Sequence, residues 1–476
     1  MNREQVLERT HRWFDEGHFL SLLRRRVAMP TASDQPGNND VLRAYLSQEM
    51  APELTASGFE CTVFDNPVAD APPLLVARRI EAEGLPCVMT YGHGDVINGQ
   101  DNLWRAGLHP WQLQVEDDRW YGRGTADNKG QHTASLSALQ QVIEARGGRL
   151  GYNVTVLMEM GEEAGSPGLR AFCERHRDLL AADLLVACDG PRVQAQRPTV
   201  FLGSRGLVNF TLSLHSRERA YHSGNWGGVL TNPAIRMAHA VASLTDANGR
   251  MAVKGLLPPP ISPEIRHTLA EVTIGGGDDD PVTTPGWGEP GLSEAERLMA
   301  WNTIEVLAMG AGQPQRPVNA IPPSAVAHCQ LRFVPGTPWE RLEVLVTEHL
   351  QSHGFDDIQV QVKASSPATR LDVNHPWVSW TLASIERSVG QRATLLPNLA
   401  GSLPNDVFAD VLGLPTVWIP HSYPACSQHA PNEHLLASVA REGMSLMAGL
   451  YWDLGERSAG APWFSPLRGS CNASSE

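Results

Sequence analysis

The stretch that decides the fold of this chain runs Pro86-Cys87-Val88-Met89-Thr90-Tyr91-Gly92-His93-Gly94-Asp95, an apolar run that ends in a glycine-flanked histidine and an aspartate. Similar apolar runs occupy residues 153–160, 184–188 and 415–419, and each is followed by carboxylate or histidine side chains. In open α/β sheets, ligands bind beyond the carboxyl ends of the strands. The pattern therefore predicts a metal site at strand ends, built from His93, Asp127, Glu163, Asp189 and His429.

This predicted site has donors for two ions. Two histidines and three carboxylates suffice for a pair of divalent ions if one carboxylate bridges them. Two-ion sites are typical of hydrolases, because one ion can activate water while the other stabilises developing charge. The residues alone therefore indicate a metallohydrolase.

Length and composition exclude several other classes. A chain of 476 residues exceeds what one hydrophobic core usually organises, so we expect two domains. Its net charge of −14, without a Lys/Arg block, argues against nucleic acid or an anionic membrane surface as partner. Seven scattered cysteines without a CxxC pair argue against a disulfide framework and fit reduced thiols. Because we find neither a signal-like segment nor 18 consecutive apolar residues, we predict a cytoplasmic protein.

The pattern of helix-like and strand-like segments changes twice along the chain. Residues 1–205 alternate helix-like and strand-like segments, such as 131–146 and 152–160, which predicts a mostly parallel sheet. Residues 206–373 contain alternating strands at 207–214 and 325–333 and a Pro/Gly/Asp-rich loop at 275–291, which indicates an α+β insertion. Residues 374–476 resume the first pattern and contain His429. We therefore predict an α/β catalytic domain interrupted by an α+β domain, with a poorly ordered tail over 456–476.

Each candidate ligand also has a simpler interpretation. Asp127 precedes a helix and could serve as its N-cap, and Asp189 could be a turn residue. The Glu162-Glu163 pair could be a solvated loop, but two adjacent carboxylates repel each other unless a cation or a shared proton relieves them. Asp95 can orient His93 by accepting a hydrogen bond from the ring nitrogen that faces away from a metal.

Two residues of the inserted segment are further candidates. His222 lies in the Gly-rich stretch Tyr221-His222-Ser223-Gly224, where a backbone can approach a ligand closely. Arg332 lies on a strand-like segment and can clamp a carboxylate with its guanidinium fork. A solvated histidine and an exposed strand arginine are the corresponding structural alternatives.

Taken together, these motifs resemble those of the M20 metallopeptidase family, in particular its dipeptidase branch of carnosinase-like and cytosolic non-specific dipeptidases. The matching segments occur in family order and cover most of the chain. They are Tyr91-Gly92-His93-Gly94-Asp95-Val96, Gly122-Arg123-Gly124-Thr125-Ala126-Asp127-Asn128-Lys129-Gly130, Gly161-Glu162-Glu163-Ala164-Gly165-Ser166-Pro167-Gly168, His222-Ser223-Gly224, Asn319-Ala320-Ile321-Pro322, Arg332 before Val334-Pro335-Gly336, Gly401-Ser402-Leu403-Pro404 and His429-Ala430-Pro431-Asn432-Glu433.

The resemblance implies a role for each residue of the metal site. Asp127 would bridge two ions, with His93 and Asp189 on one ion and Glu163 and His429 on the other. Glu162 would be the general base, and Asp95 would orient His93. The peptide after Asp127 would be cis, an arrangement that costs several kcal/mol in general.

The resemblance also implies how substrate is held. The inserted domain would be a lid and dimerisation domain whose His222 reaches the partner subunit's active site as an oxyanion stabiliser. Asn319, Arg332, His375 and Ser402 would hold the C-terminal part of the substrate. Asn319 and the tripeptide Ala400-Gly401-Ser402 depart from the family pattern, which bears on substrate identity and leaves the metal chemistry unchanged.

These observations predict a cytoplasmic, homodimeric two-metal amidohydrolase that cleaves dipeptides or similar small amides with a free carboxylate. Zinc is the first choice of metal, and manganese and cobalt are alternatives for such a ligand set. An N-acyl amino acid deacylase on the same scaffold is the alternative enzyme. A non-catalytic dimeric binding protein is the alternative outside catalysis, but such a protein would be expected to lose Glu162 or a ligand, and all are present.

Overall fold

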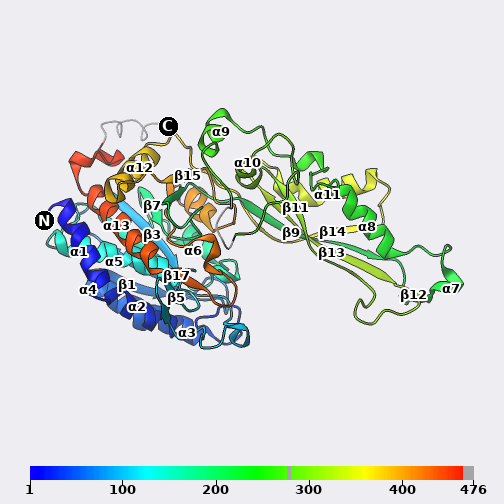
Figure 1. Cartoon of the computed structure of the whole chain (residues 1–476), viewed down its shortest axis with the longest axis horizontal. Coiled ribbons are helices and arrows are strands. Elements are labelled where there is room, and N and C mark those ends of the chain that lie inside the picture. The colour runs from blue at the N-terminus through cyan, green and yellow to red at the C-terminus, as the bar shows by residue number, and fades with distance from the viewer. Residues whose placement is uncertain (276–279, 465–476) are drawn as a thin grey trace.

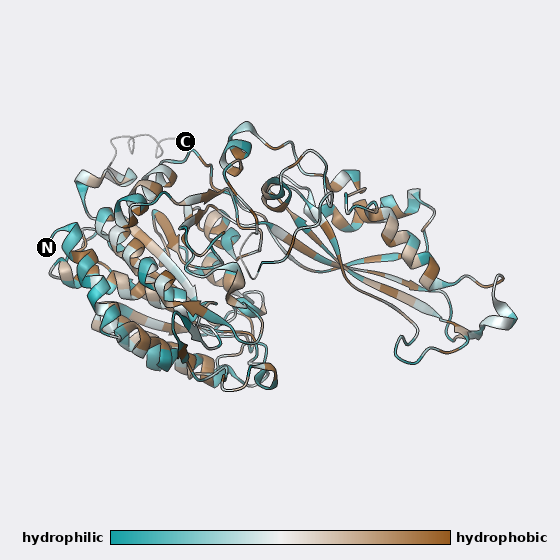
Figure 2. Cartoon of the chain, in the orientation of Figure 1, coloured by the Kyte–Doolittle hydropathy of each residue, from teal (hydrophilic) through white to brown (hydrophobic). Residues whose placement is uncertain are grey.

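The computed structural model describes residues 1–275 and 280–464, and these form two lobes (Figure 1). The larger lobe holds both ends of the described chain, and the smaller lobe extends away from it as a twisted sheet with helices on one side. The apolar strands of the larger lobe lie between helices whose outer faces are hydrophilic (Figure 2). No helix of the described residues is long and apolar enough to cross a membrane.

The larger lobe is built on an eight-stranded sheet. Its order is β1-β2-β6-β3-β7-β16-β8-β15, and the four central strands β6, β3, β7 and β16 run parallel to one another. The strands are β1 (Glu60–Phe64), β2 (Leu74–Arg79), β3 (Cys87–His93), β6 (Asn153–Glu159), β7 (Leu184–Ala187), β8 (Thr199–Phe201), β15 (Thr394–Leu396) and β16 (Thr416–Trp418). Since these central strands are parallel neighbours, their carboxyl ends meet at one edge of the sheet.

Helices cover both faces of this sheet. One face packs mainly against α1 (Arg3–Asp15), α5 (Lys129–Ala145), α12 (Pro376–Val389) and α13 (Ala437–Leu454). The other face packs against α6 (Leu169–Arg175), α9 (Pro263–Leu269) and α10 (Glu294–Met299). Further helices α2 (His18–Val27), α3 (Asn39–Ala44) and α4 (Ala51–Ala56) and a small sheet of β4 (Gln114–Glu116), β5 (Arg119–Tyr121) and β17 (His434–Leu436) complete the lobe. Both faces of the central strands are therefore buried, as their continuous apolar runs require.

The smaller lobe is an antiparallel sheet backed by helices. Its order is β11-β13-β9-β14, formed by β9 (Gly206–His215), β11 (Thr303–Ala311), β13 (Ser324–Phe333) and β14 (Gln359–Ser366). The inward residues of these strands pack against α8 (Pro233–Leu244) and α11 (Leu342–Ser352). A two-stranded antiparallel ribbon of β10 (Tyr221–His222) and β12 (Ala320–Ile321), with α7 (Ser223–Trp226), lies at its outer end (Figure 1).

The structure confirms the predicted fold class, an α/β sheet interrupted by an α+β segment. The division at residues 206 and 373 stays a prediction, and the packing adds a detail to it. Helices α9 and α10 lie inside 206–373, yet Ile265 and Met299 pack in the same apolar cluster as Leu396 and Trp418 of the larger lobe. Part of the inserted segment therefore contributes to the core of the larger lobe.

The predicted disordered tail is wrong over its first part. Residues 457–459 and 462–464 form short 3₁₀ helices, and the buried Trp463 ring lies 5.0 Å from that of Trp377 and 5.8 Å from that of Tyr152. The high proportion of Gly, Ser and charged residues concealed this aromatic anchor. The prediction for residues 465–476 lies outside the described residues.

Candidate metal centre

The five predicted ligands converge at the carboxyl ends of the four central strands. His93 ends β3, Glu163 lies in a 3₁₀ turn after β6, Asp189 follows β7, and His429 lies in the loop after β16. Asp127 comes from the turn before α5. Two groups of side chains result, each with ligand atoms within 4.8 Å of one another: His93 with Asp127 and Asp189, and Asp127 with Glu163 and His429.

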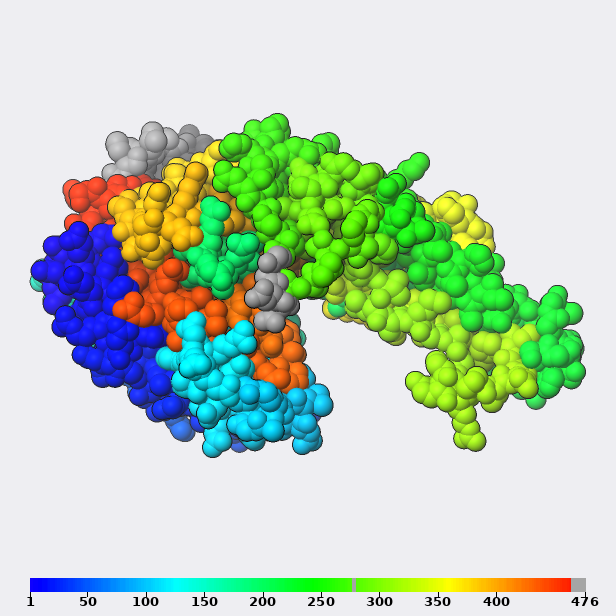
Figure 3. Space-filling view, in the orientation of Figure 1, coloured from blue at the N-terminus to red at the C-terminus, as the bar shows by residue number. Residues whose placement is uncertain are grey.

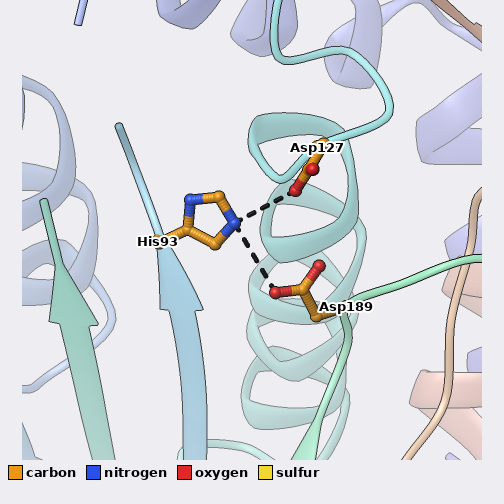
Figure 4. Close-up of side chains that lie close together, drawn as sticks. All are labelled: His93, Asp127 and Asp189. Atoms are coloured by element: carbon orange, nitrogen blue, oxygen red, sulfur yellow. Dashed lines mark hydrogen bonds and ion pairs between the residues drawn. The ribbon is translucent and has the colours of Figure 1, made fainter. Parts of the chain in front are cut away.

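Asp127 is shared by these two groups. Its Oδ1 lies 3.1 Å from His93 Nε2, and its Oδ2 lies 3.0 Å from His429 Nε2. His93 Nε2 also lies 3.5 Å from Asp189 Oδ2, so three side chains point at one another (Figure 4). On the other side, His429 Nε2 lies 2.9 Å from Glu163 Oε2. The side chain of Asp127 thus faces both groups and does not cap α5, whose N-cap is Asn128.

Asp95 holds the first group to the Glu162-Glu163 turn. Its Oδ1 lies 3.3 Å from His93 Nδ1, which leaves Nε2 of that ring for the ligand group. The same carboxylate accepts hydrogen bonds from the backbone N–H of Glu162 at 3.2 Å and of Glu163 at 3.1 Å, and from the Ser33 hydroxyl at 2.7 Å. The His-Gly-Asp tripeptide therefore orients its own histidine and the carboxylate pair of the next strand.

Electrostatics at this centre favour a cation. Burial and the charge of Asp127 raise the pKa of Glu163 to about 7, and burial together with Asp127 raises the pKa of Asp189 to about 6. Burial raises the pKa of Glu162 well above its usual value, and Asp189 adds to the effect. Hydrogen bonds to Asp127 and Glu163 raise the pKa of His429 to about 10. Crowded buried carboxylates of this kind need either protons or a positive ion.

One buried atom identifies where a positive ion fits. Asp189 Oδ2 has no hydrogen-bond partner within the described residues, although its Oδ1 accepts the Gly190 N–H at 2.6 Å. Asp189 is therefore a turn residue through Oδ1, while its Oδ2 faces His93 and is available to a metal ion. Imidazole nitrogens and carboxylate oxygens together suit zinc, manganese or cobalt. The donor set thus fits the divalent metal that the sequence predicts.

A buried ion pair that has no signal in the sequence links two of the motifs. Arg123 Nη1 lies 2.7 Å from Glu433 Oε2, and both side chains are buried. The other oxygen of Glu433 accepts the backbone N–H groups of Ala126 at 2.9 Å and Asp127 at 3.1 Å. The ion pair therefore fixes the Asp127 turn against the loop that carries His429. Both residues belong to motifs recognised in the sequence, but only their pairing shows what they do.

The centre opens into a cavity between the lobes, where the molecule is hollowed (Figure 3). This cavity has a volume of about 890 Å³, and its walls include Glu162, Glu163, Asp189 and His429. Arg332 and Ser402 line it as well, and Arg332 Nη1 donates to Ser402 Oγ at 2.9 Å. Of the predicted substrate residues, these two therefore lie with the predicted ligands and base.

The remaining predicted residues lie elsewhere in the chain. His375 is the N-cap of α12, where its Nδ1 accepts the Trp377 N–H at 3.3 Å, and it does not line the cavity. His222, in β10, and Asn319, just before β12, are exposed neighbours at the outer end of the smaller lobe (Figure 1). Within one chain, none of the three is part of the metal centre. The peptide between Asp127 and Asn128 is cis, as the resemblance implies.

The chain is similar to one peptidase family and to several dipeptidases in both sequence and structure. The model of "Peptidase family M20/M25/M40" matches residues 89–453. The Beta-Ala-His dipeptidase of Rattus norvegicus is 24% identical over 405 residues, which cover 82% of this chain and 81% of that protein. The Cysteinylglycine-S-conjugate dipeptidase of Corynebacterium striatum is 27% identical over 356 residues, covering 71% and 74%. The crystal structure of human carnosine dipeptidase 1 superposes with a TM-score of 0.77 at 22% identity, covering 94% of this chain and 99% of that one.

Proposed function

The chain belongs to peptidase family M20/M25/M40 and is a metal-binding hydrolase, and we propose that it cleaves dipeptides that carry a free C-terminal carboxylate. The observation that carries this proposal is one cavity that contains the metal centre at one side and the Arg332 guanidinium at another. Several relatives with similar sequences are named as dipeptidases. The proposal therefore combines a hydrolytic centre with a site for a carboxylate.

We further propose that the centre holds two divalent ions, with zinc as the first choice. Asp127 would bridge the ions, because its two oxygens face the two ligand groups separately. When bound, the ions would supply an acidified water and polarise the amide carbonyl. His93 and Asp189 would hold one ion, and Glu163 and His429 the other.

Glu162 would act as the general base. It lines the cavity but belongs to neither ligand group, and its Oε2 lies 3.9 Å from His93 Nε2. A carboxylate in this position can accept the proton of the attacking water and return it to the departing amine.

Arg332 would bind the substrate carboxylate. Its side chain donates to Ser402 and, at 2.7 Å, to Gln330, but among the described residues it forms no ion pair with a carboxylate. Burial lowers the pKa of the neighbouring Arg205 to about 10, and the like charge of Arg332 adds to that shift. The Arg332 guanidinium, which lines the cavity and has no carboxylate paired with it among the described residues, makes this wall attractive to an anion.

A substrate panel tests this function. We expect the metal-loaded protein to hydrolyse dipeptides with a free carboxylate at least about tenfold more efficiently, in kcat/KM, than the same dipeptides as C-terminal amides, since a charge-assisted hydrogen bond contributes about 1.5–3 kcal/mol. The variant Arg332→Gln should lose most of this preference, whereas Arg341→Gln, an exposed arginine of the same lobe, should retain it. Cleavage of N-acyl amino acids in place of dipeptides would identify a deacylase and contradict the proposal.

We also propose a homodimer in which His222 completes the active site of a second copy. His222 is exposed at the tip of the smaller lobe and does not line the cavity of its own chain. A histidine at that position can reach a reacting amide only in another subunit. There it would donate a hydrogen bond to the oxyanion that forms when water attacks.

Subunit exchange tests the role of His222. The variant His222→Ala should lose about 100- to 1000-fold in kcat, the range for removal of one oxyanion donor, while keeping its metal. Mixing it with inactive Glu162→Gln subunits should restore activity, because one site of each mixed dimer then has both groups intact. If verified mixed dimers stay inactive, or if the protein is a fully active monomer, His222 does not act across an interface.

A cytoplasmic location belongs to the same proposal. The six cysteines of the described residues are free thiols, and four of them are buried. Reduced thiols fit a reducing compartment. Fractionation of the native host with an activity assay would test this location.

A further inference from the structure

A buried chain of hydrogen bonds lies behind the metal centre. Tyr45, from the π-helical turn Tyr45–Met50, has its hydroxyl 2.8 Å from His132 Nε2. His132 Nδ1 lies 3.2 Å from Asn128 Oδ1, and Asn128 Nδ2 lies 2.8 Å from the backbone oxygen of Cys188. The side chains of Tyr45, His132 and Asn128 are between 0% and 1% exposed, so these contacts replace solvent completely.

The donors and acceptors of this series of hydrogen bonds can be assigned in only one direction. The oxygen of Cys188 can only accept, so the amide nitrogen of Asn128 must face it and Asn128 Oδ1 must be an acceptor. His132 Nδ1 therefore carries the proton, which leaves Nε2 to accept from the Tyr45 hydroxyl. Each donor is matched to an acceptor from Tyr45 to Cys188. Removing one member leaves a buried polar atom without a partner, which is costly.

The same side chains pack closely against the backbone on both sides of His93. A Cβ atom on Gly92 would lie 2.8 Å from His132 Cβ, and one on Gly94 would lie 2.4 Å from the Tyr45 ring. Glycine on both sides of His93 is what allows this approach. The backbone therefore packs closely against His132 just before His93, at Gly92, and against Tyr45 just after it, at Gly94.

These hydrogen-bonded side chains contact the neighbours of all three ligands of the first group, of which Asp127 also belongs to the second group. Asn128 follows Asp127, Cys188 precedes Asp189, and Gly92 and Gly94 flank His93. The hydrogen bonds that link Tyr45, His132, Asn128 and Cys188 do not involve Glu163 or His429. We propose that Tyr45, His132 and Asn128 are positioning residues that set the geometry of the ion position formed by His93, Asp127 and Asp189. This inference rests on the proposed two-ion site.

A single-atom deletion tests the inference. In Tyr45→Phe we expect about tenfold weaker binding of the ion held by His93, Asp127 and Asp189. This is the lower end of the effect of changing groups that orient metal ligands. The other ion should bind as tightly as in the wild-type protein. The matched control is Tyr152→Phe, which removes another fully buried hydroxyl that donates to the Tyr451 backbone oxygen at 2.8 Å. Titration of metal-free protein with Co²⁺, followed by calorimetry and visible absorption, measures both ions and needs no substrate.

A second variant tests the same role at another residue, in case the structure adjusts to the loss of the Tyr45 hydroxyl. His132→Leu removes the donor to Asn128 and should weaken the same ion by about 10- to 100-fold. If both variants bind two Co²⁺ ions as tightly as the control, or if they weaken both ions equally, the inference is overturned. If the wild-type protein binds only one Co²⁺, the two-ion proposal is contradicted. The positioning role is then tested by whether Tyr45→Phe binds that one ion more weakly than the wild type. An unchanged protein that binds no Co²⁺ overturns both.

Discussion

Complete removal of divalent metal is expected to abolish hydrolysis. The ions would supply several kcal/mol of charge stabilisation, which corresponds to a loss of at least about 1000-fold. The reason lies in the centre itself, where Glu162, Glu163, Asp127 and Asp189 crowd around two histidines and Asp189 Oδ2 lacks a hydrogen-bond partner within the described residues. Exhaustive chelation, verified by elemental analysis and followed by assay, measures the effect.

Reconstitution provides the control for this experiment. Adding back zinc, manganese or cobalt separately should restore activity, and a plateau at two ions per chain would support the proposed stoichiometry. The order of the restored activities would show which metal serves this centre best. Undiminished turnover in protein shown to be free of metal would contradict any mechanism that uses these ligands.

Replacement of Glu162 by Gln is expected to reduce kcat by roughly 100-fold or more, the contribution typical of a positioned acid or base. Glutamine has nearly the shape of glutamate, so the 3₁₀ turn Glu162–Ala164 should persist, held by the backbone hydrogen bonds to Asp95. Since Glu162 lies outside both ligand groups, the variant should keep its full metal content. Steady-state kinetics together with metal analysis test both expectations.

The adjacent residue provides a matched control. Glu163 has the same side chain one position along, but its Oε2 lies 2.9 Å from His429 Nε2 within the second ligand group. Glu163→Gln should therefore weaken metal binding, and added metal should recover part of its activity. If Glu162→Gln loses metal while Glu163→Gln retains it, the two roles are reversed.

Much of the metal centre could be predicted because its ligands follow local patterns. An apolar run followed by Gly-His-Gly-Asp, or by Gly-Glu-Glu, reads as a buried strand that ends in polar side chains. Parallel strands place such ends at one edge of a sheet. The order β6-β3-β7-β16 places the four strands side by side, so His93 and His429, separated by 336 positions, both lie beside Asp127. The return of the pattern after residue 374 predicted this meeting.

Other features depend on contacts between distant segments and have no local signal. The sequence contains Tyr45, His132 and Asn128 without indicating that they are hydrogen-bonded to one another, and Arg123 and Glu433 likewise belong to separate motifs. The buried Trp463 in a tail that resembles a disordered one is a third example. In each case the interaction depends on packing across the sheet or between helices, which periodicity and spacing do not record.

The sequence by itself determined the fold class, the family and the set of side chains able to bind metal, because strand periodicity and short motifs are properties of contiguous residues. Only the tertiary structure decided how these side chains are arranged. It showed that Asp127 faces both ligand groups, that Arg332 and Ser402 share their cavity, and that His222 and His375 do not line it. These facts depend on the relative placement of two lobes and of segments far apart in the chain, which is set by the burial of apolar surface and the pairing of buried polar groups.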